Sequence, residues 1–474
     1  MPDPRILLVI WLLTSSFIWY PTKVNANTSA SFVGSINCKA CHQNEYDNWQ
    51  GSHHQLAMQT ATAATVLGDF NDAEFNYEGV TSRFYVRDGG YFVFTDGADG
   101  KMAEFEIMNT FGVDPLQQYL VSLPGGRLQA LSIAWDSRSE EQGGQRWIHL
   151  YPDEAIGPDD ELHWSGLQMN WNYMCADCHS TNLEKKYQSD DKRFDTTWSE
   201  IHVGCEACHG PGSNHLAWAG KTKANRDAQS DMGLKILLRE RQGTHWLTDA
   251  ESGNPKRNTP NTQRREIDVC AACHSRRSLI AEGAARDGRF LDHYQPALLT
   301  EGLYHPDGQI LDEVYVWGSF TQSKMFAAGV TCSNCHDSHS MQLVAPGDAV
   351  CASCHVASQY TNRNHHQHPE KSAGARCVGC HMPEKTYMVV DPRRDHSLRV
   401  PRPDLSAEFG TPDACTQCHQ NKSNAWASRH FRQWYPDPAP PFQTWATAFI
   451  AARNGIPAAG PMLVELITND KIPA

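Results

Sequence analysis

The sequence predicts a mainly α-helical and irregular fold with a small β-rich insertion and a helical C-terminal tail. Three observations predict it: short cysteine-histidine motifs crowd most of the chain, a strand-like pattern fills one long gap between them, and helical periodicity follows the last motif. The 474 residues allow about two to four domains. With 40% hydrophobic and 20% charged residues, the chain is neither a polytopic membrane protein nor a disordered tail.

All 16 cysteines fall into Cys-x-x-Cys pairs, and each pair is followed at once by a histidine. The eight motifs, numbered 1 to 8 in chain order, are Cys38, Cys41 and His42; Cys175, Cys178 and His179; Cys205, Cys208 and His209; Cys270, Cys273 and His274; Cys332, Cys335 and His336; Cys351, Cys354 and His355; Cys377, Cys380 and His381; and Cys415, Cys418 and His419. This spacing is typical of c-type haem attachment, in which two thiols bind one porphyrin and the adjacent imidazole binds its iron. Structural zinc ribbons and redox or structural disulfides also use paired cysteines, but neither requires the histidine. We therefore expect eight covalently bound haems c, haem 1 to haem 8.

Seven of these motifs lie within residues 175–419, which leaves about 35 residues for each. So little chain cannot build a conventional apolar core, and the haems must supply most of it by stacking close together. The sequence thus predicts a mainly α and irregular multihaem cytochrome fold organised around stacked haems. We expect each motif to open a helical turn or to lie within one.

The long segment between motif 1 and motif 2 has a different residue pattern from the rest of the chain. Residues 84–86 and 91–94 predict two strands around a Gly-containing turn, the signal repeats at 96–107, and 128–135 is apolar and compatible with a strand. We expect a β-rich insertion over 68–160, between a first haem segment (27–67) and a seven-haem domain (161–435). The insertion is either a structural lid or a surface for a substrate or partner.

The N-terminus predicts export. Arg5 precedes an apolar run at 6–13, and Val24, Asn25 and Ala26 form a cleavage site, so residues 1–26 resemble a secretory signal peptide. The alternative is an uncleaved membrane anchor, for which residues 6–20 are short. The mature chain is therefore expected in the periplasm or otherwise outside the cytoplasm.

Helices are expected after the last motif, at 426–435, 445–453 and 462–467. The tail, 436–474, resembles the first pair of a helical repeat, and such repeats need neighbours to bury their faces. The sequence leaves open that a longer repeat array has been truncated here.

The net charge of −13 excludes nucleic acid as the main partner. A basic cluster nevertheless lies late in the chain, at Lys385, Arg393, Arg394, Arg399 and Arg402. We expect these side chains to pair with haem propionates; the alternative is a solvated face.

Fifteen histidines lie outside the motifs and could bind iron on the side opposite the motif histidine, as distal ligands. After motif 3, a Gly-Pro-Gly turn directs His215 away from its own haem toward a neighbour. After motif 5, His339 lies one helical turn beyond His336, so both cannot bind one iron from opposite faces. Such histidines should bind adjacent haems and fix pairs of haems together.

The segment from Cys38 to Met58, with Tyr46, Trp49 and Gly51-Ser-His-His-Gln-Leu-Ala-Met58, resembles the opening of the cytochrome c-554-like multihaem family. The run from motif 3 to His215, that from motif 5 to His339, and motif 7 with Met382-Pro383, Asp395-His-Ser397 and Arg399-Val-Pro-Arg-Pro403 extend the resemblance over roughly residues 34–435. The closest versions resemble multihaem cytochromes with C-terminal helical repeats. The wider superfamily includes hydroxylamine oxidoreductase, pentahaem nitrite reductase and octahaem tetrathionate reductase as well as electron carriers, so the resemblance implies a fold rather than an activity.

The resemblance implies distal roles for His54, His215, His339 and His396. It also implies such roles for His305 and for one of His365 or His366, of which we include His366 in the predicted set. His54 fits the family pattern better than His53. His149 and His163 are alternative ligands, and Met58 and Met325 could serve as sixth ligands but are expected to pack in the interior.

The predicted function is that of an exported octahaem c-type cytochrome that transfers electrons through mostly bis-histidine haems in a respiratory chain, with redox proteins as partners. The alternative is an oxidoreductase that acts on a small inorganic nitrogen or sulfur compound at one five-coordinate haem. No Cys-x-x-Cys-Lys motif occurs, which disfavours an ammonia-forming nitrite reductase. A hydroxylamine oxidoreductase-like tyrosine cross-link has three candidates, Tyr304, Tyr315 and Tyr387, and the spacing selects none of them. A structural subunit of a membrane-associated respiratory complex is a third possibility, and the oligomeric state is not predicted.

Overall fold

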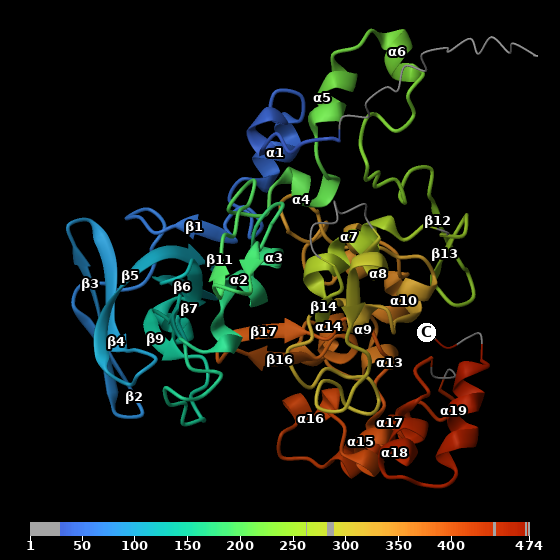
Figure 1. Ribbon diagram of the computed structural model, residues 1–474. Coiled ribbons are helices and arrows are strands. Elements are labelled where there is room, and N and C mark those ends of the chain that lie inside the picture. Colours follow the sequence, from blue (N-terminus) through green and yellow to red (C-terminus); the bar gives the residue numbers. More distant parts are fainter. Residues whose placement is uncertain (1–28, 262, 282–288, 439–441, 470–471, 473–474) are drawn as a thin grey trace, which may run out of the picture.

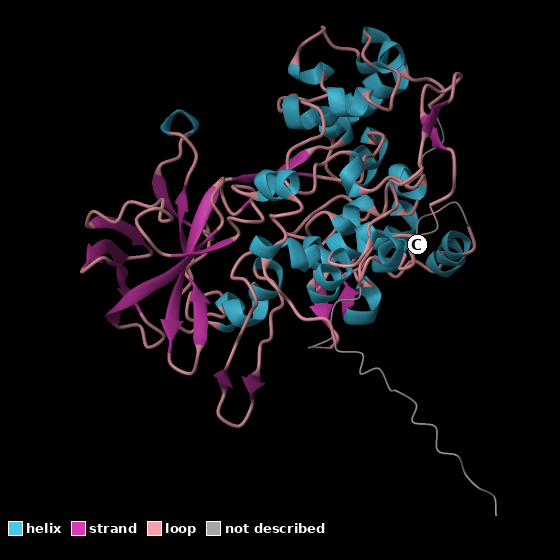
Figure 2. Ribbon diagram, turned by 90° about the horizontal axis from the view of Figure 1, so that it is seen from above, coloured by secondary structure: helices cyan, strands magenta, loops and turns pink. Residues whose placement is uncertain are grey.

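The computed structural model describes residues 29–261, 263–281, 289–438, 442–469 and 472. A curved antiparallel sheet lies on one side of the molecule, and a larger body of short helices and loops lies on the other (Figures 1 and 2). The predicted signal peptide, residues 1–26, falls outside the described residues. Within the described ranges, none of the helices has the length and apolar character needed to cross a bilayer.

The sheet has nine strands and occupies the segment between motif 1 and motif 2. They are β1 (Met58–Thr60), β2 (Ala73–Tyr77), β3 (Val80–Arg87), β4 (Gly90–Asp96), β5 (Met102–Phe111), β6 (Leu116–Leu123), β7 (Arg127–Ala130), β8 (Ile133–Asp136) and β9 (Arg146–His149). The order is β2-β3-β4-β5-β6-β8-β9, with β1 paired to β5 and β7 paired to β6. Arg87 pairs with Gly90 where β3 turns into β4, which confirms the predicted strand pair around a Gly-containing turn.

One face of the sheet closes over an aromatic core. Phe84 on β3 and Trp147 on β9 stack with ring centres 3.7 Å apart, and Phe70 packs edge-on against both. Tyr119 on β6 completes the group and is fully buried. This core contains no motif residue, so the sheet has an apolar interior of its own.

Removing the ring at the centre of this core should unfold the sheet. We expect Phe84→Ala to lower the free energy of unfolding by roughly 3–5 kcal/mol, because a fully buried aromatic side chain leaves a cavity. Val86→Ala, two residues along the same strand at a half-exposed position, is the matched control and should change it by less than about 1 kcal/mol. Urea unfolding followed by the strand signal in far-UV circular dichroism measures both. Equal losses in the two variants would contradict this description of the core.

Short helices make up most of the second body. They are α1 (Gln43–Trp49), α2 (Trp171–Met174), α3 (Ala176–His179), α4 (Cys205–His209), α5 (Ser213–Ala219), α6 (Lys223–Asp227), α7 (Arg265–His274), α8 (Phe290–His293), α9 (Trp317–Phe320), α10 (Lys324–Ala327), α11 (Ala349–Ala352), α12 (Ala357–Tyr360), α13 (Arg363–His366), α14 (Cys377–His381), α15 (Pro403–Phe409), α16 (Ala414–Cys418), α17 (Asn424–Trp434), α18 (Ala446–Arg453) and α19 (Ala459–Ile467). Single 3-10 turns are η1 (Ser35–Asn37), η2 (Glu140–Gln142), η3 (Leu167–Met169), η4 (Cys332–Asn334) and η5 (Ala373–Ala375). Most of these helices are seven residues long or shorter.

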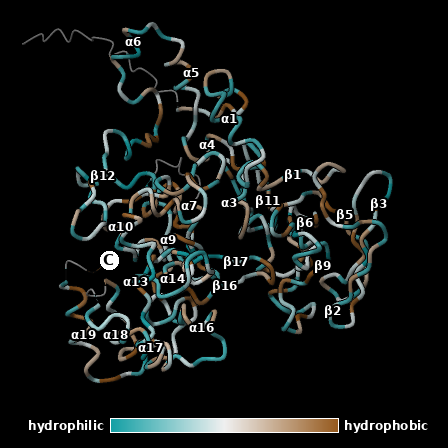
Figure 3. The backbone as a smooth tube through the Cα atoms, turned by 180° about the vertical axis from the view of Figure 1, so that it is seen from behind, coloured by the Kyte–Doolittle hydropathy of each residue, from teal (hydrophilic) through white to brown (hydrophobic). Residues whose placement is uncertain are grey.

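Among the described residues, four two-stranded sheets interrupt these helices. They pair β10 (Tyr187–Gln188) with β11 (Arg193–Phe194), β12 (Trp246–Thr248) with β13 (Pro255–Arg257), β14 (Arg277–Leu279) with β15 (Tyr294–Pro296), and β16 (Glu384–Tyr387) with β17 (Asp391–Arg394). Polar and apolar segments alternate closely through this body, as the hydropathy colouring in Figure 3 shows. The apolar clusters among the described residues of this body are small, such as that of Ala271, Ala272, Phe290 and Tyr294, in contrast to the core of the sheet.

The prediction of a mainly α fold with a small β-rich insertion is wrong. Helices take up 29% of the chain and strands 20%, and the sheet is large. Each motif needs only one helical turn to place two thiols and an imidazole, so the motifs add little helix. The alternation of buried and exposed residues continues from β2 through β5, and β6, β8 and β9 are largely buried, so the sheet extends well beyond the two hairpins that the sequence analysis identified.

The predicted C-terminal helices are present. α17, α18 and α19 coincide with the expected segments, and α18 packs against α19. α17 begins after Ser423, whose side chain accepts a hydrogen bond from the backbone N–H of Trp426 and caps the helix.

Candidate metal centres

The backbone of each motif brings its three functional side chains to one place. In motifs 1, 5, 6 and 8, the backbone N–H of the histidine donates a helical hydrogen bond to the carbonyl of the first cysteine. His336, for example, donates to the Cys332 carbonyl at 2.9 Å. All sixteen cysteines are free thiols, so none is used in a disulfide. Two thiols three residues apart and the next imidazole therefore project from a single turn, as attachment of one porphyrin requires.

Five motif histidines face a second histidine across a constant gap. The pairs and their ring-centre distances are His42 and His215 at 6.1 Å, His274 and His54 at 6.1 Å, His336 and His396 at 6.5 Å, His381 and His365 at 6.1 Å, and His419 and His368 at 6.1 Å. An imidazole nitrogen binds a metal at about 2 Å, so two imidazoles on opposite sides of one iron place their ring centres about 6 Å apart. The gaps between the paired rings fit a single iron atom.

A sixth motif histidine also has a histidine close by. Burial, followed by the charges of His339, His42 and His215, lowers the pKa of His209 to about 4. His339 is therefore an electrostatic neighbour of His209, without a ring contact between the two among the described residues. That His339 binds the haem of a neighbouring motif stays a prediction from the sequence.

Two motif histidines stand apart from this pattern. The closest ring to His179 is that of Phe111, at 5.7 Å edge-on, and the closest ring to His355 is that of Tyr360, also at 5.7 Å. Among the ring contacts of the described residues, no imidazole lies opposite either of them. Motifs 2 and 6 therefore differ from the five motifs whose histidines face a second ring, and motif 3 has only the electrostatic neighbour His339.

Hydrogen bonds at the outer ring nitrogen hold several of these imidazoles in position. Nδ1 of His381 bonds the Arg399 carbonyl at 2.7 Å, and Nδ1 of His215 bonds the Met232 carbonyl at 2.8 Å. Nδ1 of His179 bonds the Ala57 carbonyl at 3.2 Å. Such a bond fixes the tautomer in which Nδ1 carries the proton and Nε2 has a free lone pair for a metal.

Burial favours the neutral form of several of the paired imidazoles. It lowers the pKa of His54 to about 4, and the charges of His274, His53 and His179 lower it further in the same direction. It also lowers the pKa values of His274, His381 and His396. The neutral form is the one that binds a metal, so these sites are ready for iron at neutral pH.

Bare metal ions do not fit the same residues. Across the described part of the chain, no three His, Cys, Asp or Glu side chains come together as a metal-ion site. A tetrahedral zinc site would need four such ligands in one place. The opposed imidazoles, each beside a pair of thiols, are instead the donor set of haem c.

The remaining sequence-predicted ligands lie in other settings. His305 is half-buried beside Asp307, and the ring contacts of the described residues do not include it. His149 stacks on Tyr77 at 3.6 Å, and His163 bonds Asp96 at 3.2 Å, so both belong to the sheet.

The second histidine of motifs 7 and 8 comes from one short segment. His365 faces His381, whereas His366 lies at the end of α13 and its carbonyl accepts from Nδ1 of His368. His368, which the sequence analysis did not select, faces His419. The run of three histidines within four residues was the available signal, but it does not show which rings reach a neighbouring motif.

The methionines and tyrosines that the sequence singled out also have definite places. Met58 is fully buried in an apolar cluster beneath motif 2, as expected for a packing residue. Tyr304 is fully buried in a separate cluster, and the Tyr387 hydroxyl donates to the Asp312 carbonyl. Tyr315 is the candidate that lies beside motif 2, close enough for Cys175 and Cys178 to affect its pKa.

Each arginine of the late basic cluster has a carboxylate partner in the chain. Arg393 pairs with Glu313 at 2.5 Å and Asp391 at 2.6 Å, and the buried Arg399 pairs with Asp307 at 3.0 Å. Arg394 pairs with Glu384 at 2.7 Å, Arg402 pairs with Asp404 at 2.6 Å, and Lys385 donates to the Leu311 carbonyl. These pairs crosslink the segment between motifs 7 and 8, so it is not a freely solvated face.

Motifs distant in sequence touch through their cysteines. The thiols hydrogen-bond between Cys38 and Cys205, between Cys178 and Cys273, between Cys270 and Cys332, and between Cys351 and Cys377. In a haem-bearing chain these sulfurs are thioethers at porphyrin edges, so it is their proximity that matters. The contacts place motif 1 beside 3, motif 2 beside 4, motif 4 beside 5 and motif 6 beside 7.

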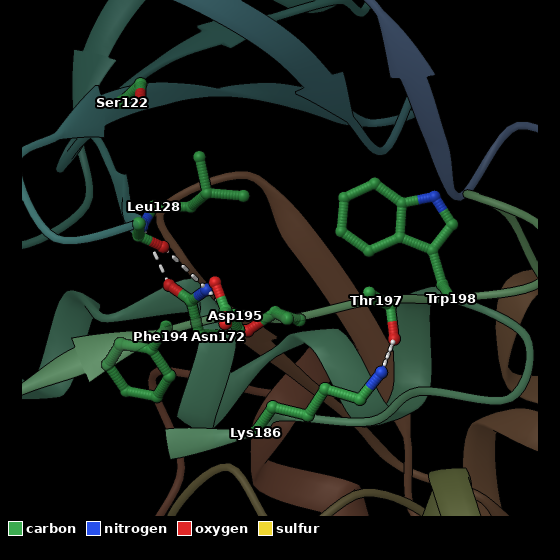
Figure 4. A pocket seen from close by; sticks show the side chains of 10 residues that line it. Ser122, Leu128, Asn172, Lys186, Phe194, Asp195, Thr197 and Trp198 are labelled. Carbon is green, nitrogen blue, oxygen red and sulfur yellow. Dashed lines mark hydrogen bonds between the residues drawn. The ribbon is translucent and has the colours of Figure 1, made fainter. Parts of the chain in front are cut away.

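A pocket of about 430 Å³ lies between the sheet and the β10–β11 hairpin (Figure 4). Asn172 spans its floor by accepting from the Leu128 N–H at 2.7 Å and donating to the Gly126 carbonyl at 3.1 Å. Lys186 donates to Thr197 at its rim at 3.0 Å. Its lining contains no motif cysteine or histidine, so the pocket is separate from the paired imidazoles.

One family of known proteins matches part of the chain. The family described as cytochrome c554 and c-prime matches residues 37–74 and 158–210. The two matched segments flank 75–157, which holds most of the large sheet. No curated protein matches the chain significantly.

Two solved structures resemble the chain. The outer cell wall cytochrome OcwA has a TM-score of 0.52 and 16% identity, with 90% of this chain and 91% of that chain covered. The octahaem sulfite reductase MccA of Wolinella succinogenes has a TM-score of 0.33 and 14% identity, with 78% of this chain and 58% of that chain covered. The likeness to OcwA shows a shared fold along nearly the whole chain.

Proposed function

Because this chain is a multihaem c-type cytochrome, we propose that it carries eight covalently bound haems c and transfers electrons through them in a respiratory chain. The observation that carries the proposal is the set of opposed histidine rings 6.1–6.5 Å apart, each containing one motif histidine. When bound, haem supplies a one-electron centre that needs no acid-base help from the protein.

The side chains have three tasks in this function. The sixteen motif cysteines would attach the haems, and the eight motif histidines would bind iron on one side. His54, His215, His339, His365, His368 and His396 would bind it on the other side for haems 4, 1, 3, 7, 8 and 5. Bis-imidazole ligation keeps iron six-coordinate in both oxidation states, so little rearrangement accompanies electron transfer.

The haems would form a closely spaced series. The cysteine contacts join motifs 1 and 3, 2 and 4, 4 and 5, and 6 and 7, and electrostatic contacts between cysteines join 3 to 4, 5 to 6 and 7 to 8. Cys41 in motif 1 and Cys418 in motif 8 are the two exposed cysteines of the sixteen. We expect redox partner proteins to exchange electrons at these two ends, and residues 1–26 to direct the chain out of the cytoplasm.

Haem counting tests this proposal. Intact mass of the purified protein should show eight haem additions, and the pyridine haemochrome assay should give eight haems per chain. Stepwise reduction in an optical titration should be reversible and should span several potentials. A chain that binds zinc or forms disulfides in place of haem would overturn the proposal.

A second function is favoured by the two motif histidines that lack an opposed imidazole, His179 and His355. A haem at such a site would keep an exchangeable sixth position, which an oxidoreductase acting on a small nitrogen or sulfur compound needs. Added nitrite, hydroxylamine or sulfite should then change the spectrum of the oxidised protein by an amount that fits one or two haems of the eight. A spectrum unchanged by all three would leave electron transfer as the sole function.

The choice between two neighbouring histidines gives a sharp test of the ligand set. In His365→Ala, haem 7 should lose an axial ligand and one haem should change from low to high spin, because His365 faces His381. His366→Ala is the control on the same helix and should leave haem 7 low spin, because the His366 side chain accepts from the His368 N–H and does not face His381. Electron paramagnetic resonance of the oxidised proteins measures both. The reverse outcome would assign the role to His366.

A further inference from the structure

A buried ion pair joins the attachment motifs of haems 2 and 4. Asp177 lies between the two cysteines of motif 2, and Arg277 begins β14 three residues after the histidine of motif 4. Nη2 of Arg277 is 2.5 Å from Oδ2 of Asp177, and the two side chains are 11% and 13% exposed. Such a pair is costly to desolvate, so it has a role beyond surface charge.

The guanidinium of Arg277 contacts both motifs directly. It donates to the carbonyl of Ala272 in motif 4 from Nε at 2.9 Å and from Nη2 at 2.7 Å. Nη2 also lies 3.5 Å from Sγ of Cys178 in motif 2. The charge therefore lies between the attachment points of the two haems.

Tyr294 holds this charge in place. The Tyr294 ring lies 4.0 Å from the Arg277 guanidinium, and its hydroxyl donates to Asp177 at 3.1 Å. An arginine held by two carbonyl bonds, a carboxylate and a ring face has little freedom to turn away. The positions of both charges are thus fixed relative to the two haems.

The junction that the pair occupies is a branch point. Cys178 lies 3.7 Å from the Cys273 carbonyl, and its thiol bonds that of Cys273. Cys270, at the other end of motif 4, contacts Cys332 of motif 5. Among the cysteine contacts between described residues, those of motif 2 reach only motif 4, whereas those of motif 4 also reach motif 5.

We propose that the Arg277–Asp177 pair sets the reduction potentials of haems 2 and 4 relative to the other six and so controls electron flow onto the haem 2 branch. The proposal rests on the proposed function, because it requires haems at motifs 2 and 4. A fixed positive charge near iron favours the reduced form and a fixed negative charge favours the oxidised form, and both effects are strong in a buried, weakly screened site. Arg277 would affect electron transfer only through the reduction potentials of haems 2 and 4, so it is a positioning residue and not a catalytic one.

Removing the positive charge and removing the negative charge should shift the potentials in opposite directions, which makes the test specific. Arg277→Gln leaves Asp177 as an unbalanced negative charge, so the midpoint potential of the affected haems should fall. Asp177→Asn leaves the positive charge and should raise the potential of the same haems. The double variant should return them toward the wild-type value, and Arg277→Lys, which retains the charge, should change them least. We expect each single variant to change the oxidised-to-reduced ratio about tenfold at fixed potential, which is about 59 mV for one electron.

Potentiometric titration followed by electron paramagnetic resonance and optical spectra resolves the eight haems and gives this readout. The matched control is Arg276→Gln, because Arg276 is adjacent, about half exposed, and 4.0 Å from Asp312. Its titration should superimpose on that of the wild type. If Arg277→Gln fails to fold, Asp177→Asn and the double variant still give the sign of the effect.

Titrations of Arg277→Gln and Asp177→Asn that superimpose on the wild type would overturn the proposal, as would shifts of the same sign in both. A merely structural pair would lower haem content or stability in both single variants without opposed shifts in potential. Failure of the proposed function would look different, since the wild-type protein itself would then lack haem or would not titrate reversibly.

Discussion

His54→Ala should convert one of the eight haems from low to high spin and should slow electron transfer through the protein by at least about tenfold. The reason is that His54, although it follows motif 1, faces His274 of motif 4 at 6.1 Å. Motif 4 contacts motifs 2 and 5 through its cysteines. Loss of an axial ligand at haem 4 would therefore interrupt electron transfer in the middle of the series of haems. Electron paramagnetic resonance gives the spin state, and stopped-flow reduction gives the rate.

His53→Ala is the matched control for this experiment. His53 is the preceding residue, it is exposed, and it does not belong to any of the opposed ring pairs in the described chain. Its spectrum and reduction rate should equal those of the wild type. Unchanged low-spin iron in His54→Ala would contradict the assignment of His54 to haem 4.

Loss of haem 4 should prevent the second body from folding. We expect Cys270→Ala with Cys273→Ala to give no soluble holoprotein, because α7 carries motif 4 and packs against α3, α8, α9 and η4. The haem at its centre would supply the apolar contacts that the surrounding chain does not make. Soluble yield and haem content per chain measure the effect.

The equivalent change at motif 8 should be far milder. Cys415→Ala with Cys418→Ala alters α16 at the edge, where Cys418 is exposed. A soluble protein with seven haems is expected. If both double variants gave equal yields of seven-haem protein, haem 4 would not be the centre of the fold.

The candidate site was largely predictable from sequence where its residues are close along the chain. A motif histidine and its cysteines share one turn, so their spacing alone indicates haem. The distal histidines are separated from their partners by large stretches of sequence, as with His54 and His274, and no spacing rule relates them. His215 was found because Gly210 and Gly212 flank a turn that redirects the chain, and Gly210 has a positive φ of 72° that favours glycine.

His365 and His368 show where sequence reasoning reached its limit. Gln367, with a left-handed φ of 59°, ends α13 and separates the two rings so that one faces His381 and the other His419. That reversal depends on how α13 packs, which no local pattern reveals. The helical periodicity of α17 to α19 was clear, by contrast, because each helix has its own apolar face.

The sheet was underestimated for a related reason. Hairpin signals located β3, β4 and part of β5, and the apolar segment 128–135 overlaps β7 and β8. No local signal marked β6 or β9, and the register between β5 and β6 is irregular between Ile107 and Asn109. Their aromatic residues meet in a core that can be recognised only once the strands are paired. Long-range pairing, not local preference, determined the size of this part.

We expect six motif histidines to share an iron with a second imidazole, five through an opposed ring and His209 through His339, while His179 and His355 do not. Near-infrared magnetic circular dichroism of the fully oxidised protein, which distinguishes bis-histidine haem from other low-spin ligation, tests this most directly. We expect the bis-histidine signal to have the intensity of six of the eight haems in each chain. An intensity of eight, or of fewer than six, would contradict it.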